Sequence, residues 1–366
     1  MKKYRNLLGA VIAVFVLACS LIKVSYFYRG YTRLMDFYGY KRNSMDMVVI
    51  GTSVTFSSYI PMEIWEEYGI SSCNYSTNVM FENSIKYGIR DVMKTQHPQL
   101  ILVDIAPFLM ESYPDHPGWD DDWRNQFISY NVDSRKISID RIKLVWEINE
   151  AIGGDLYSFF YYLFDINRYH SSVPVVDGYR WKNSTNDNAD RGYFYMPRME
   201  GEDIDDKNLL FADANKKYDT EGKLSDISIM YLNELIKEVK DISDKKNVDI
   251  AFYCAPIFFV DEDTICKKES VSQILSENDM LFYDLTSESV NMNFYEDFWG
   301  HDHFDYLGAH KVTEIMYNNI ISKYDIEDRR EDSRYSFWNS DYEKWLEKKE
   351  EYLSNDIYRI EEDLRM

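Results

Sequence analysis

Ser53 stands where a serine hydroxyl could act as a nucleophile. It follows the apolar, β-branched run 47–51 (MVVIG) and Thr52, and a helical segment comes after it. A serine raised out of a sheet in this way can attack a carbonyl carbon, and its own N–H can face the developing oxyanion. A turn serine or a helix N-cap would have the same sequence. The G-x-S-x-G pattern of the α/β-hydrolase elbow is absent.

Two histidines near the C-terminus could supply the base that such a serine needs. His301 and His303 come just before a helical pattern at 309–322, and Asp297 and Asp302 are their neighbours in sequence. An imidazole on the last loop of an α/β sheet can remove the serine proton. The same residues could form a polar helix entry. They could also be two ligands of a metal-dependent hydrolase, although no third cluster of ligands is evident.

The elements that must position these residues alternate between strands and helices. Apolar runs predict strands, and stripes of apolar residues with helical spacing predict helices. The strands are expected at 47–51, 71–75, 100–105, 248–256 and 280–285, and the helices from Pro61 and at 82–94, 226–244 and 309–322. This order predicts an α/β fold with a doubly wound parallel sheet. The carboxyl ends of its strands place Ser53, Asp104 and the segment after Leu285 at one edge.

The chain divides into a main domain and smaller flanking parts. The α/β domain is predicted at 46–324 and is interrupted by an irregular, aromatic and acidic insertion at 107–225. We expect this insertion to form a helical cap over the sheet edge and to carry specificity. Residues 28–45 form a membrane-proximal neck, and 325–366 form a charged tail with a surface helix at 344–353.

The N-terminus has the pattern of a membrane anchor. Residues 7–22 are uncharged, and Lys23 can snorkel, so 6–27 suffice for one spanning helix within a segment 1–27. Basic residues before the run keep that end in the cytoplasm. The alternatives are a cleaved signal peptide and a lipoprotein signal ending at Cys19. All three place the body on the extracytoplasmic face, and the uncleaved anchor predicts a single-pass protein of the cytoplasmic membrane.

Composition limits the partners. The 366 residues include 41 Lys and Arg and 63 Asp and Glu, and residues 1–24 hold four of the basic residues and no acidic one. The rest therefore has 37 basic and 63 acidic residues, net −26, which argues against nucleic acid as a partner. The four cysteines form no C-x-x-C pair, and a Cys254–Cys266 disulfide is compatible with the sequence.

Taken together, the serine, the histidines and their spacing resemble the SGNH/GDSL hydrolase superfamily, in its membrane-anchored DltD-like branch. The similar stretches are 48–70, 74–105, 168–172 (RYHSS), 297–314 and 333–347. The resemblance covers most of residues 45–350 and is weakest in 110–225. It implies a three-layer, flavodoxin-like parallel sheet with helices on both faces, preceded by one N-terminal transmembrane helix.

The resemblance implies roles for the catalytic residues. Ser53 matches the nucleophile, and His303 matches the base, because Gly308 follows it with the family's H-x-x-x-x-G spacing. The family's orienting Asp lies three residues before that histidine, where this chain has Gly300. Asp297 is the substitute that we expect, since a residue adjacent to the histidine usually projects elsewhere.

The resemblance also implies oxyanion and substrate residues. Ser76 occupies the family's glycine position and could donate its N–H, and Asn78 is a further candidate donor or a turn residue. Asp104 stands where the family has an Asn donor, and we expect it to be structural. His170 and Trp299 are candidate substrate-binding residues, with loop packing as the alternative.

The implied function is a membrane-anchored, extracytoplasmic serine acyltransferase or esterase that modifies a cell-envelope polysaccharide or teichoic acid through an acyl-serine intermediate. The implied partners are the glycan or teichoic acid acceptor, a membrane-bound O-acyltransferase and the bilayer through residues 6–27. No cofactor and no metal are needed. The alternative is a catalytically weak SGNH-like scaffold or polymer-binding subunit, because the Asp is missing at position 300.

Overall fold

The computed structural model describes most of the chain from Leu34 onward. The described residues are 34–133, 135–164, 189–197, 210, 216, 218–259 and 261–363, together with 9, 12, 13, 16 and 17 and without the side chains of 35, 36 and 356–363. Within them, no helix combines the length and the apolar character needed to cross a bilayer. The predicted anchor 6–27 and His170 lie outside the described residues, apart from five positions of the anchor.

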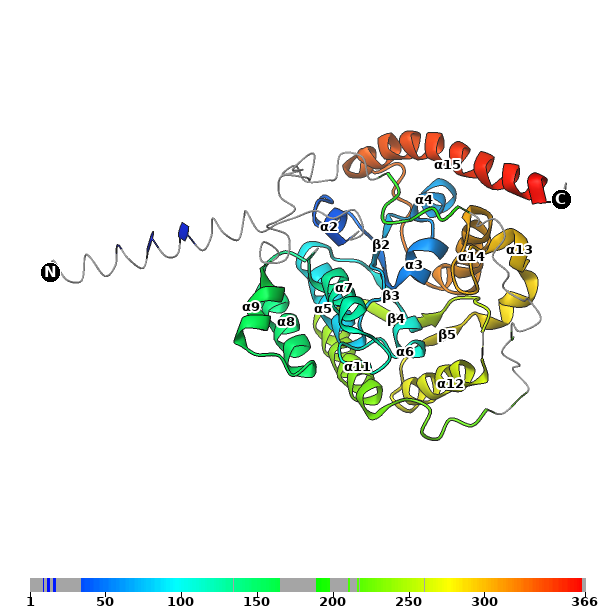
Figure 1. Cartoon of the computed structure of the whole chain (residues 1–366). Helices are drawn as coiled ribbons and strands as arrows, with labels where there is room; N and C mark the ends of the chain where they lie inside the picture. The colour runs from blue at the N-terminus through cyan, green and yellow to red at the C-terminus, as the bar shows by residue number, and fades with distance from the viewer. Residues whose placement is uncertain are drawn as a thin grey trace.

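A five-stranded, all-parallel sheet forms the centre of the molecule (Figure 1). Its strands are β1 (Met47–Gly51), β2 (Ser72–Ser76), β3 (Leu100–Asp104), β4 (Asp249–Cys254) and β5 (Phe282–Asp284), in the order β2-β1-β3-β4-β5. The predicted α/β class and parallel sheet are confirmed, with every strand bound within two residues. β1, β2 and β3 are buried along their whole length, as strands covered on both faces must be.

Helices cover the sheet in two groups. α14 (Tyr306–Asn319) contacts both α3 (Ser53–Ser58) and α4 (Pro61–Tyr68), and α5 (Glu82–Thr95) contacts α11 (Asp226–Lys246). Going from β1 to β2, the chain moves across the sheet in one direction, and from β2 onward it moves in the other. Because each crossover is right-handed, the helices after β1 and the helices after β2 and β3 lie on opposite faces of the sheet. The strand order reverses between β1 and β3, and this is the point where doubly wound sheets bind ligands.

The remaining elements are shorter or lie outside these layers. α12 (Glu262–Glu277), which was not predicted, connects β4 to β5. The short pieces are α2 (Leu34–Phe37), α6 (Ala106–Leu109), α13 (Phe294–Asp297) and the 3₁₀ turns η4 (Thr286–Asn291), η5 (Ile321–Lys323) and η6 (Ser333–Tyr335). Cys73, Cys254 and Cys266 are buried free thiols, so the disulfide that the sequence allowed is absent from the described chain.

The described part of the insertion builds a helical unit on α5, and a separate stretch of it runs along the edge of β2. Its helices are α7 (Asp121–Val132), α8 (Ile139–Ala151) and α9 (Leu156–Leu163). Their apolar side chains form a second core with Phe81 and Tyr87 of the α5 region. That stretch is 189–197, where the Arg191 carbonyl accepts a hydrogen bond from the Asn74 amide (2.9 Å).

The C-terminal tail contributes to the core, whereas the sequence predicted only a surface helix at 344–353. α15 (Ser336–Asp363) packs on α4 and α14 (Figure 1). The side chains of Trp338 and Trp345 are fully buried, and Trp338 stacks on Trp65 with 5.0 Å between ring centroids. The Arg191 guanidinium lies 4.3 Å from the Trp338 ring, which connects the insertion to this helix.

Candidate functional site

Ser53 begins α3 at the carboxyl end of β1. It is half-buried and lies between the fully buried residues Thr52 and Val54. Thr52 caps the helix by accepting a hydrogen bond from the Val54 amide (3.3 Å). Gly51 is required just before this turn, because a Cβ there would lie 2.7 Å from the Asp104 Cβ. The sequence therefore produces a close approach of β1 and β3 directly beneath the serine.

A buried carboxyl lies beside this turn, at the end of β3. Asp104 Oδ2 accepts a hydrogen bond from Thr55 Oγ1 (3.0 Å), and Oδ1 accepts one from the Ala106 amide (3.0 Å). Burial, together with a smaller contribution from the negative charge of Asp302, raises the pKa of Asp104 to about 7, although these two hydrogen bonds act to lower it. Asp302, 198 residues later in the chain, thus lies within electrostatic range of the β3 end.

His303 is oriented by its neighbour Asp302. Its Nδ1 lies 2.6 Å from Asp302 Oδ1, and its ring packs edge-on against Trp299 with centroids 5.6 Å apart. Burial acts to raise the pKa of the Asp302 carboxyl, but the charge and hydrogen bond of His303, with His301 beside it, lower it overall. An ionised carboxylate only accepts hydrogen bonds, so Nδ1 carries the proton of the neutral ring and Nε2 is left as the base.

Asp297 has a different partner from the one that the sequence analysis expected. Its carboxylate is buried and accepts hydrogen bonds from Lys311 Nζ (2.7 Å) and from the Asn293 amide (2.8 Å). A Cβ at Gly308 would lie 1.8 Å from the Asp297 carbonyl oxygen, so the glycine of the H-x-x-x-x-G spacing is needed for packing. The carboxylate that holds His303 is Asp302, and the choice of Asp297 is corrected.

The backbone of Ser76 does not face Ser53. The Thr77 amide donates to the Gly51 carbonyl (3.3 Å), so alternation along β2 turns the Ser76 amide away from β1. The Asn74 amide points the same way and donates to Arg191. The expectation that the Ser76 N–H lies in the oxyanion site is therefore not supported by the ladder.

The side chain of Ser76 lies on the face of β2 that packs against the end of α3. Ser72, Asn74 and Ser76 share one face of β2, and the first two bond to Tyr59 at the end of α3 (2.8 and 2.9 Å). The Ser76 Oγ is buried and has no hydrogen-bond partner among the described residues. Asn78 follows in a turn and is half-buried.

Sequence reasoning missed Thr55 and Tyr253, which complete the polar contacts beneath Ser53. The Tyr253 hydroxyl lies 3.3 Å from Thr55 Oγ1. Two features of the sequence could have indicated them: a threonine two residues after the serine, and a tyrosine as the second-to-last residue of a buried strand. His170 is among the candidates that lie outside the described residues.

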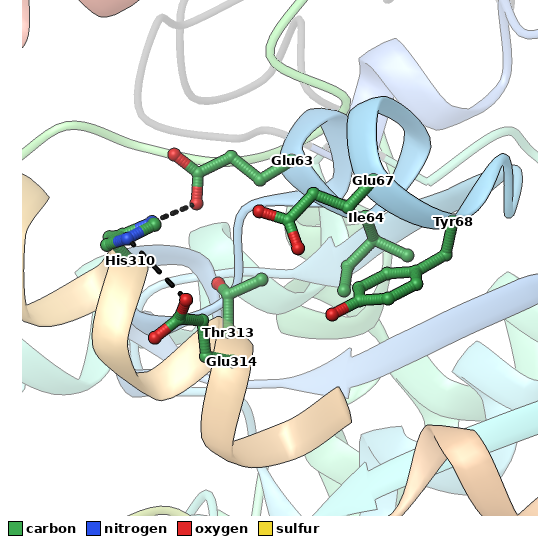
Figure 2. A pocket seen from close by; sticks show the side chains of 7 residues that line it. All are labelled: Glu63, Ile64, Glu67, Tyr68, His310, Thr313 and Glu314. Atoms are coloured by element: carbon green, nitrogen blue, oxygen red, sulfur yellow. Dashed lines mark hydrogen bonds and ion pairs between the residues drawn. The ribbon is translucent and has the colours of Figure 1, made fainter. Parts of the chain in front are cut away.

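A second titratable group, centred on His310 and Glu63, lies between α4 and α14 (Figure 2). His310 Nδ1 is 2.9 Å from Glu63 Oε2, and Tyr306 donates to Glu63 Oε1 (2.6 Å). The Glu63 hydrogen bond raises the pKa of His310. Lys349 of α15 adds an ion pair 3.7 Å from Glu63. The shallow pocket here is lined by Glu63, Ile64, Glu67, Tyr68, His310, Thr313 and Glu314. We interpret this group as a structural link between three helices.

In the described residues, no group of three or more His, Cys, Asp or Glu side chains could hold a metal ion. The fold and the site define a doubly wound α/β protein with a serine, a histidine–aspartate pair and a buried carboxyl at the sheet's carboxyl edge. A scan of protein-family models finds no match to the chain, and searches among curated proteins and among solved structures find none either.

Proposed function

We propose that the chain is a membrane-anchored, extracytoplasmic serine acyltransferase or esterase, with Ser53 as nucleophile and His303 as base. The observation that carries the proposal is the 2.6 Å contact between His303 Nδ1 and Asp302, on the loop that precedes α14. α14 packs against α3, the helix that Ser53 begins. The Asp302 carboxylate also influences Asp104 at the neighbouring strand end. The resemblance to SGNH hydrolases gives the same two catalytic residues.

The reaction follows from these groups. His303 Nε2 removes the proton of Ser53 as the hydroxyl oxygen attacks the acyl carbonyl carbon of the donor. The imidazolium then returns that proton to the leaving group, and an ester of Ser53 remains. In the second half, His303 removes a proton from an acceptor hydroxyl or from water, whose oxygen attacks the ester and releases Ser53.

Three further groups support the charge changes in this reaction. Asp302 takes the orienting role that Asp297 does not fill, and stabilises the imidazolium. The Ser53 N–H in the first turn of α3 has no acceptor within the helix and can donate to an oxyanion. The Ser76 hydroxyl on the α3-facing side of β2 is a second donor in this proposal, and Asn78 a third.

The proposed setting comes from the sequence and the resemblance. The acceptor would be a hydroxyl of an envelope polysaccharide or teichoic acid, and a membrane-bound O-acyltransferase would deliver the acyl group. His170 and Trp299 would contact the substrate, and residues 6–27 would hold the enzyme at the bilayer. The net charge of −26 beyond residue 24 requires a locally neutral groove for an anionic acceptor.

The test is covalent labelling of the full chain in detergent micelles with a fluorophosphonate, followed by peptide mass spectrometry. We expect one adduct on Ser53, which is lost in Ser53→Ala and strongly slowed in His303→Ala. His301→Ala is the matched control, because it removes the other imidazole of the same loop. An adduct at another serine, or equal rates in both histidine variants, would refute the assignment.

The alternative function is a scaffold or polymer-binding subunit of an envelope O-acylation system. Two observations favour it: Gly300 stands at the family's acid position, and the buried Asp104 stands where an oxyanion donor is expected. This alternative predicts binding of the polymer with no adduct at Ser53 and no effect of Ser53→Ala on binding.

A further inference from the structure

The outer face of the α8–α9 hairpin exposes large apolar side chains. Ile139 is 73 % exposed and Trp146 47 % exposed on α8, and Leu156 and Tyr157 are 65 % and 77 % exposed on α9. The Trp146 ring lies 5.5 Å from that of Phe159, so it joins the two helices into one surface. Isolated exposed apolar residues are ordinary, but four large ones on a single two-helix hairpin indicate an interaction surface.

The composition of α9 reinforces this point. Its sequence, LYSFFYYL, contains seven apolar or aromatic residues out of eight, so apolar side chains point in most directions from the helix. Phe159, Tyr162 and Leu163 are buried in the core that α9 shares with α7 and α8, and Tyr161 is partly buried against it, whereas Leu156 and Tyr157 stay largely exposed. A helix that is apolar all round needs apolar surroundings on its outer side as well.

The hairpin is held rigidly in place. Asp140, in the first turn of α8, forms ion pairs with Arg90 (3.4 Å) and Lys94 (2.5 Å) of α5. The other end of the hairpin closes through Asn149, whose side chain donates to the carbonyls of Gly154 and Asp155 (both 3.1 Å). The exposed apolar face is therefore a fixed part of the surface, on the outside of α5 (Figure 1).

The hairpin also lies beside the neck of the molecule. Just before α8, Lys136 Nζ donates to the Tyr38 carbonyl (3.2 Å) and lies 5.1 Å from the Tyr38 ring. Tyr38 directly follows α2, and only residues 23–33 separate α2 from the uncharged run 7–22. Eleven residues span at most about 40 Å when fully extended. A bilayer that contains the run 7–22 is thus within reach of this part of the surface.

We propose that the α8–α9 hairpin rests in the interfacial layer of the bilayer that the N-terminal run enters. Trp146 and Tyr157 would lie at headgroup level, where such amphipathic rings are enriched, and Ile139 and Leu156 among the first acyl carbons. The acidic body gains nothing from anionic lipids, so the contact is driven by apolar burial and is insensitive to salt. The proposal rests on the proposed membrane anchor, and is independent of the chemistry at Ser53.

The test uses the full chain in phosphatidylcholine nanodiscs, with and without bromine on acyl carbons near the headgroup. Residues 1–33 contain no tryptophan, so any quenching by brominated lipid reports on the body of the protein. We expect brominated lipid to lower the tryptophan emission of the wild-type chain, and Trp146→Phe to abolish most of that loss. Trp123→Phe is the matched control, since Trp123 is 54 % exposed on α7 and should leave the loss unchanged.

A second pair of variants covers the case in which Trp146→Phe disturbs the hairpin. The double variant Leu156→Gln, Tyr157→Gln keeps Trp146 and should reduce its quenching, whereas Leu281→Gln, at another largely exposed leucine just before β5, should not. Salt at 1 M should change neither result. The proposal is overturned if brominated lipid does not quench the wild-type chain, or quenches Trp146→Phe equally. It is also overturned if the hairpin crosslinks to a second protein chain in place of lipid. Labelling of Ser53 on the same samples reports separately on the catalytic proposal.

Discussion

Replacing Asp302 by Asn tests the site most directly, because the sequence favoured Asp297 and the structure pairs His303 with Asp302. The amide can present its NH₂ group to Nδ1, which moves the ring proton to Nε2 and removes the base. In serine proteases the same change costs about 10⁴ in turnover with the geometry intact. For a pair held at 2.6 Å we expect a loss of about 10³ to 10⁴ in the rate of Ser53 labelling, or about 4–5.5 kcal/mol.

The assay is the second-order rate of fluorophosphonate labelling, measured on chains whose thermal unfolding is recorded in parallel. Asp297→Asn is the matched control, because that carboxylate is buried against Lys311. It should lower the free energy of unfolding by about 1–3 kcal/mol and change the labelling rate by less than about tenfold. The assignment is wrong if Asp302→Asn labels at the wild-type rate, or if the two variants are slowed equally.

Three more substitutions test charges and packing described above. Burial raises the pKa of Asp104 to about 7, so the folded state holds this proton more tightly than the unfolded chain, and the contribution of this group to stability falls as pH rises from about 4 to 7. Relative to wild type, Asp104→Asn should therefore gain on the order of a few kcal/mol between pH 4 and pH 7 in urea unfolding, and an unchanged difference would contradict this. The Glu63 hydrogen bond raises the pKa of His310, so the contribution of this pair to stability is complete below the unfolded pKa of about 6.5 and is lost as pH rises above the folded value. The variant His310→Gln should therefore be less stable than the wild type at pH 5.5 and equally stable at pH 9. A stability deficit that persists at pH 9 would contradict this. Trp338→Ala should cost about 3–5 kcal/mol, because the ring is fully buried against Trp65, whereas a cost below about 1 kcal/mol would place α15 outside the core.

The sheet could be predicted because buried parallel strands are continuous apolar runs. β1 and β3 read MVVIG and LILVD, and no helix of the usual length fits between their flanking turns. α12 was missed because its charged residues interrupt the apolar stripe. The burial of α15 was missed because its many charges hide two tryptophans seven residues apart, Trp338 and Trp345, on one face of the helix.

The site could be predicted only as far as the order of the strands allowed. Ser53 could be predicted from the end of β1, and His303 from the loop before α14. The orienting carboxylate, Asp302, could not be predicted, because its position depends on a local backbone fold that no sequence pattern indicates. An antiparallel bridge between Phe298 and Phe304, with the Trp299 amide donating to the His303 carbonyl (3.0 Å), closes a tight loop. This loop brings the side chains of the adjacent residues Asp302 and His303 together.

The pairing of β3 with β4 also has a consequence for how the chain is made. These central strands are adjacent in space, yet residues 105–248 lie between them, so closing this contact carries a large entropic cost and slows folding. During synthesis at about 5–20 residues per second, the open edge of β3 would wait roughly 7–30 s for its neighbour. The nascent chain therefore passes through an interval with an exposed apolar strand edge, when association with other chains competes with completion of the sheet.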